Sequence, residues 1–133
     1  MNTPVSFEIA KLLKEKGFSN HCSNFYTNPR CKMFGIDEHG RYYPIKNKAK
    51  TLWINGHAAT LDSRHVYYAP TIADAVMWLY KEHKIWISVD PENDTDTWFY
   101  TISHNKSEVV FGYYNGPTEA YEAAIEHVLN NMI

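Results

Sequence analysis

The chain of 133 residues is long enough for one domain to bury a hydrophobic core without disulfides or metal ions. Hydrophobic residues make up 44% and charged residues 21% of the sequence, as in ordinary globular proteins. The net charge of −2 provides no basic field for DNA or an anionic membrane, and no apolar run approaches the roughly 20 residues of a membrane-spanning helix.

An amphipathic helix is the first predicted element, over residues 5–16, where apolar residues recur at helical spacing. Two caps compete for its start, Thr3 followed by Pro4, or Ser6. Gly17 is expected to end it, because glycine adopts a left-handed conformation at little cost. The lysines follow the apolar positions, so the segment does not read as a signal peptide. We therefore expect a cytoplasmic protein.

The middle of the chain, residues 18–69, carries weaker signals. MFGI at 33–36 and RYYPI at 41–45 flank DEHG, and this arrangement predicts a β-hairpin. TLWI at 51–54 indicates another strand, and residues 57–69 are predicted to be loop.

The C-terminal half is more regular. Thr71 and Asp74 form a capping-box arrangement before a helix, and Thr118 is expected to cap the last helix. Between these helices lie three strands rich in β-branched and aromatic residues, at 85–89, 98–103 and 109–114. Short connections require neighbouring strands to be antiparallel, because a parallel pair needs a long crossover.

These elements predict an α+β fold, in which about three helices pack on one face of an antiparallel sheet. The sheet would combine the C-terminal three-strand meander with the N-terminal hairpin. We expect a single domain over 1–133, with an αβββα core at 71–133 and a variable middle at 18–69.

Aromatic residues amount to 15% of the chain, and strand alternation distributes them over both sheet faces. Tyr100 and Phe111 would lie on the face covered by helices. Trp86, Phe99 and Tyr114 would share the second face with small polar residues. Three interpretations stay open for that second face: burial within the domain, a protein or self-association surface, and a platform on which single-stranded nucleic acid stacks.

The segment HCSNFYTNPRC at 21–31 is the main candidate for chemistry. Cys22 and Cys31 are separated by eight residues, with His21 and His39 nearby, and this spacing lacks the C-x₂₋₄-C knuckle of a structural zinc site. We predict no metal and no cofactor. A small Cys/His enzyme around Cys22 or His57 is a remote alternative, with His65 as a further histidine to test.

The runs APTIADAVMWLYKEHKIWISV, WFYTIS and EAYEAAIEHVLNNMI, together with the opening SFEIAKLLKEKGF, resemble a group of small uncharacterised proteins. These proteins occur in bacteriophages, prophages and mobile elements of gut bacteria and have no assigned activity. The resemblance implies a phage or mobile-element accessory protein made in the bacterial cytoplasm. It transfers no catalytic or binding residue, and it implies that partner specificity lies in the variable middle.

The sequence thus favours a non-enzymatic module that binds a protein partner or itself, with no membrane partner. The alternative is a single-stranded nucleic-acid binder that uses the aromatic face, helped by three lysines of the middle segment. These lysines are Lys46, Lys48 and Lys50.

Overall fold

The computed structural model describes residues 3–20, 22, 24–27, 32–36, 42–44, 53–54, 57–58, 66–93 and 96–133. The chain divides into two compact units. The αβββα unit joins Met1–Val5 to Thr71–Ile133, and the 6–70 unit runs from Ser6 to Pro70. The single domain over 1–133 stays a prediction. The described helices and antiparallel sheets confirm the α+β class. The predicted hairpin and meander belong to separate sheets, so the expectation of one combined sheet is wrong.

Helix α1, Phe7–Glu15, begins and ends at residues that the sequence singles out. Ser6 is the N-cap, and its hydroxyl accepts a hydrogen bond from the Ile9 N–H at 3.4 Å, so the second of the two competing caps is confirmed. Gly17 has φ +100°. The Phe18 N–H donates to the Leu13 carbonyl and the Gly17 N–H to the Lys14 carbonyl, which is the Schellman pattern of helix ends.

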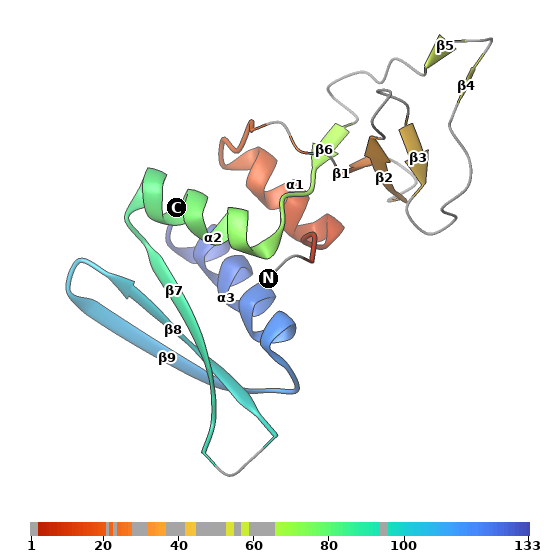
Figure 1. The fold of residues 1–133 in the computed structure, drawn as a ribbon. Helices are drawn as coiled ribbons and strands as arrows, with labels where there is room; N and C mark the ends of the chain where they lie inside the picture. Colours follow the sequence, from red (N-terminus) through yellow and green to blue (C-terminus); the bar gives the residue numbers. More distant parts are fainter. Residues whose placement is uncertain are drawn as a thin grey trace. The chain divides into compact units, whose positions relative to one another are not determined.

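The described strands of the 6–70 unit form two antiparallel sheets (Figure 1). They are β1 Asn24–Thr27, β2 Lys32–Ile36, β3 Tyr42–Pro44, β4 Trp53–Ile54, β5 His57–Ala58 and β6 Val66–Tyr68. The larger has the order β3-β2-β1-β6, and β2 with β3 confirms the predicted hairpin. The smaller pairs β4 with β5. The loop predicted over 57–69 is wrong at β5 and β6, and β1 was not foreseen.

Helix α1 packs against β6, and an aromatic cluster joins it to the larger sheet. The Phe7 ring meets the rings of Tyr26 and Tyr67 edge-on, with centroids 5.6 and 5.3 Å apart. The Lys14 ammonium lies 4.5 Å from the centroid of the Tyr67 ring, where the negative face of the ring attracts it. This cluster explains why α1 belongs to the 6–70 unit.

Helix α2, Ile72–His83, opens the main segment of the αβββα unit. Its N-cap is Thr71, whose hydroxyl accepts the Asp74 N–H at 3.2 Å, as the capping box predicts. The Ile72 N–H donates to the Thr3 carbonyl at 2.9 Å, and Pro4 bridges to Thr71. The first residues of the chain therefore supply a partner for a backbone donor that the first turn of a helix leaves unpaired.

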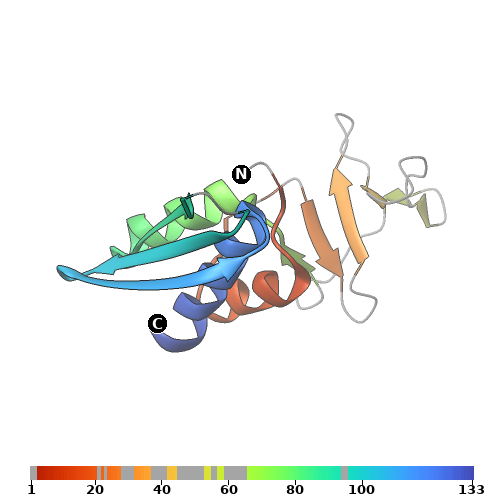
Figure 2. The same cartoon turned by 90° about the horizontal axis from the view of Figure 1, so that it is seen from below.

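The predicted three-strand meander is confirmed as β7, Trp86–Pro91, β8, Trp98–His104, and β9, Ser107–Tyr114. The strand β8 lies between β7 and β9, and both pairs are antiparallel. Asn105 and Lys106 join β8 to β9 with φ of 50° and 65°, which is the two-residue type I′ turn of hairpins. The hairpin of β8 and β9 extends as a long twisted ribbon (Figure 2).

Helix α3, Pro117–Asn131, covers one face of this sheet and contacts all three strands. Its N-cap is Gly116, without a side-chain hydrogen bond, so the predicted cap Thr118 is wrong. Pro117 has a fixed φ that suits the first helical position, and the helix therefore starts one residue before Thr118. The buried residues of α3 face Ile87, Tyr100 and Ile102 of the sheet. They are Ala120, Ala124, Ile125, Val128 and Leu129.

Candidate interaction surface

The sheet of the αβββα unit has a second face, which we call the open face. Opposed residues of antiparallel strands share a face, so the registers define it. None of its residues is buried, and the described helices that contact the sheet leave them half-buried or exposed. The open face consists of Trp86, Ser88, Asp90, Phe99, Thr101, Ser103, Glu108, Val110 and Gly112.

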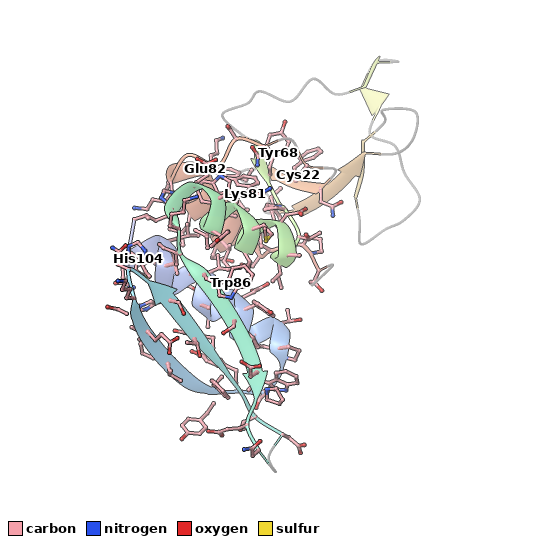
Figure 3. The ribbon with its side chains drawn as sticks, turned by 60° about the vertical axis from the view of Figure 1, so that its left-hand side comes forward. Cys22, Tyr68, Lys81, Glu82, Trp86 and His104 are labelled. Carbon is pink, nitrogen blue, oxygen red and sulfur yellow. The ribbon has the colours of Figure 1, made fainter. Side chains whose placement is uncertain are left out.

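Two predicted site residues, Trp86 and Phe99, lie at opposite ends of the open face. Trp86 is 42% exposed and meets the Tyr80 ring of α2 edge-on, with centroids 5.5 Å apart. It is the first residue of β7, and Figure 3 shows its side chain below α2. Trp86 pairs with Ser103 of β8, and Phe99 lies four residues from Ser103 along that strand. At about 3.3 Å per residue, the two aromatic residues are therefore about 13 Å apart. The structure therefore places both on one face as predicted, but not in contact range.

Tyr114, the third predicted site residue, lies on the other face, and this corrects the sequence prediction. Trp98 pairs with Tyr114 and Phe99 with Gly112, so Tyr113 is an extra residue that forms a β-bulge. The bulge shifts the alternation by one residue. The Tyr114 ring consequently stacks on Tyr100 beneath the sheet, with centroids 5.7 Å apart and planes at 24°.

Tyr113 itself is the most exposed large hydrophobic residue of the described chain, at 77%. Its φ of 85° is a region that residues with a bulky side chain rarely adopt. Strict alternation predicts that Tyr113 lies on the helix-covered face, so the sequence does not single it out. No local pattern marks the bulge, apart from Gly112 immediately before it.

Behind the sheet, the helix-covered face holds an aromatic cluster. Phe111 lies 5.2 Å from both the Tyr100 ring and the His127 ring of α3. Burial, then the neighbouring Tyr114 phenol and a hydrogen bond with it, raise the pKa of Tyr100 to about 12. Burial, followed by the negative charge of Asp90, raises the pKa of Tyr121. Both phenols thus stay neutral near pH 7, which suits a structural role in packing.

Strand β9 forms one edge of the sheet and is the most exposed strand of the αβββα unit. Residues 107–113 are all exposed, although most are apolar. The exposed fractions are 41% for Val109, 60% for Val110 and 38% for Phe111. Phe111 is thus on the helix-covered side, as predicted, but not enclosed. An edge that is long and apolar is a template for pairing with another strand.

The charges on the open face are negative. Asp90 and Glu108 are exposed, and the nine residues of this face include neither lysine nor arginine. Within these nine residues, phosphate groups of a nucleic acid would meet two carboxylates and no cation. Lys46, Lys48 and Lys50, the basic residues of the nucleic-acid alternative, lie outside the described residues.

The structure describes only some of the Cys and His residues that the sequence analysis names for a metal or catalytic site. The Cys22 thiol donates to the Asn20 carbonyl at 3.5 Å, and His57 belongs to β5. His21, Cys31, His39 and His65 lie outside the described residues. Within the described part of the chain, no three His, Cys, Asp or Glu side chains are grouped as metal ligands.

His83 and His104 have structural contacts. His83 ends α2, and its ring meets the Trp78 ring edge-on, with centroids 5.1 Å apart. His104, labelled in Figure 3, places Nδ1 3.3 Å from the Lys84 carbonyl. These histidines thus connect the end of α2 to neighbouring residues of the αβββα unit.

None of the helices in the described part of the chain has both the length and the apolar content to traverse a lipid bilayer. In comparisons with known proteins, no family model, no curated protein and no solved structure matches this chain.

Proposed function

We propose that this chain is a non-enzymatic interaction module that binds a protein through β9 and the adjoining open face. The exposure of β9 carries this proposal. Natural sheets usually protect an edge with lysine, proline or a covering element, because an unprotected edge pairs with other chains. Glu108 is the only charged residue in Ser107–Tyr114, and the strand contains no proline.

The backbone of β9 supports the same proposal. In a type I′ turn the first residue's carbonyl accepts the fourth residue's N–H, so the Ser107 N–H points to His104 on β8. Backbone groups alternate along an antiparallel strand, and those of Val109 and Phe111 therefore also point to β8. The N–H and C=O groups of Glu108, Val110 and Gly112 point away from the sheet. An incoming strand would pair with these three residues.

The side chains add anchors for such a partner. Val110 and Tyr113 are 60% and 77% exposed, and Trp86 is 42% exposed at the far end of the open face. Exposed tyrosine and tryptophan are the residues most enriched among strong contacts in protein interfaces. A strand added at β9 would cover Val110, and its flanking residues would contact Tyr113.

The origin of the protein is part of the proposal. The resemblance to phage and mobile-element proteins supports an accessory role in a bacterial cytoplasm. The negative open face favours a protein partner over single-stranded nucleic acid. Anisotropy of labelled oligonucleotides at low salt tests the second partner directly, and we expect no change.

Binding experiments with two matched lysine variants test the module. Val110→Lys adds a positive charge to the free edge, and Asn130→Lys adds the same charge to an exposed position on α3. We expect a partner retained by the wild type from bacterial lysate to be lost with Val110→Lys and kept with Asn130→Lys. Equal retention by both variants would contradict docking at β9.

A further inference from the structure

We propose that the partner of β9 is a second copy of the same chain, paired antiparallel about a two-fold axis at Val110. This inference rests on the proposed function of β9 as a docking edge. It follows from which side chains an antiparallel self-pairing would place opposite one another.

The register centred on Val110 is complementary to itself. Val110 faces Val110 of the second copy, and both residues direct their backbone groups to the free edge. Glu108 faces Gly112 of the second copy, where no side chain opposes the carboxylate. Val109 faces Phe111 of the second copy, so two half-exposed apolar side chains cover each other.

Neighbouring registers are less favourable. A pairing centred on Glu108 would oppose two carboxylates. A pairing centred on Val109 would place Glu108 against Val110, and would thus desolvate a carboxylate on an apolar side chain. A pairing centred on Phe111 would bring Val109 to the bulge at Tyr113, where the extended ladder is interrupted. Of these four registers, only the one at Val110 avoids both charge conflicts and meets the bulge no earlier than its ends, where Ser107 faces Tyr113 of the second copy.

The other edge of the sheet is protected. Strand β7 ends with Asp90 and Pro91, a charge and a residue without an N–H donor, and α2 contacts this strand. Within the described part of the αβββα unit, one edge of the sheet is therefore protected and the other is unpaired. A specific pairing at β9 explains this difference.

The expected dimer is weak. The register pairs Glu108 with Gly112 twice and Val110 with itself, and each such pair exchanges two backbone hydrogen bonds, about six in all. An interface of one short strand per copy is smaller than the roughly 1,200 Å² of the smallest stable interfaces. We therefore expect a dissociation constant on the order of 10 µM.

Sedimentation of the purified full chain tests the pairing between about 1 µM and about 500 µM. The wild type should change from monomer to dimer over this range. Val110→Lys places two lysines opposite each other at the axis and should weaken the dimer about tenfold or more. Asn130→Lys should dimerise like the wild type.

Substitutions at Gly112 test the register itself. A Cβ at this position would meet the Phe99 Cβ at 3.6 Å, an ordinary contact, so side chains are tolerated. Gly112→Lys would face Glu108 of the second copy and should dimerise at least as well as the wild type. Gly112→Glu would face the same carboxylate and should dimerise about tenfold less well than Gly112→Lys at low salt.

The outcomes separate this inference from the proposed function. A wild type that stays monomeric at the highest concentration, or equal dimerisation of Gly112→Lys and Gly112→Glu, would overturn self-pairing. If Val110→Lys nevertheless loses a partner from lysate, docking at β9 stands and its partner is another protein. Circular dichroism of each variant establishes that it is folded before its mass is compared.

Discussion

Two adjacent tyrosines, Tyr113 and Tyr114, are expected to respond oppositely to truncation. Tyr113 has φ 85° and is 77% exposed, so its side chain contributes little packing while its backbone is strained. A left-handed conformation costs a residue with a Cβ about 1–2 kcal/mol. Glycine removes that cost but loses about 0.5–1 kcal/mol of backbone entropy on folding. Tyr113→Gly should therefore raise the free energy of unfolding by about 0.5–1 kcal/mol.

Tyr114 has the opposite environment, half-buried and stacked on Tyr100. Tyr114→Ala removes that burial and the stacking, which together contribute about 2 kcal/mol or more. Tyr113→Ala is the control, because alanine keeps the strained φ and should leave stability nearly unchanged.

Urea unfolding followed by circular dichroism measures these differences from the midpoints at a common slope. The reasoning would be refuted if Tyr113→Gly lost more than about 1 kcal/mol while Tyr113→Ala lost none. That result would mean that residue 113 has an ordinary extended backbone. Glycine would then relieve no strain there and would destabilise the protein only by increasing the conformational entropy of the unfolded chain. Without the bulge, Tyr114 would return to the open face.

Two further predictions concern the αβββα unit, one for the end of α2 and one for the Tyr100 phenol. Lys84 follows α2 with φ 57°, so Lys84→Gly should relieve about 1 kcal/mol of backbone strain and raise the melting temperature. Lys81 is exposed inside the helix, so Lys81→Gly should destabilise the protein by about 1 kcal/mol and lower the melting temperature. Equal effects of the two substitutions would contradict the left-handed conformation at the end of α2. The pKa of Tyr100 is about 12 in the folded protein against the ordinary 10.0, so the folded state holds this proton more tightly. Its contribution to stability is complete below pH 10 and is lost as the pH rises through 12. Melting curves between about pH 9 and 12 should fall more steeply for the wild type than for Tyr100→Phe, and parallel curves would contradict a buried Tyr100 phenol.

Local signals in the sequence predicted the elements that local interactions determine. Ser6 and Thr71 cap their helices with their own hydroxyls, and Gly17 ends α1, all within one helical turn of the signal. The predicted hairpin and meander were likewise recognisable because short connections join their strands. These features need no information from distant parts of the chain.

The strands that were missed depend on distant partners. In the larger sheet of the 6–70 unit, β1 pairs with β6 across about 40 residues, and neither strand has a long alternating pattern of its own. A pairing of this kind is stabilised by its neighbours in the sheet, which a local reading of residues 57–69 does not include.

The candidate site shows the same limit at the scale of one residue. Trp86 and Phe99 lie on the predicted face because their strands keep a regular register. Tyr114 does not, because one extra residue at Tyr113 reverses the alternation beyond it. A bulge reflects the twist of an edge strand against its neighbour, and Gly112 is the only residue of the run VVFGYY that hints at one.

Amide hydrogen exchange along β9 tests the central claim, that this strand is a free edge available for pairing. In dilute protein, the Val109 and Phe111 amides should exchange slowly, and those of Glu108, Val110 and Gly112 should exchange rapidly. At high concentration the three rapid amides should become protected together. Uniform protection of all five amides in dilute protein, or rapid exchange of the three at every concentration, would contradict the account.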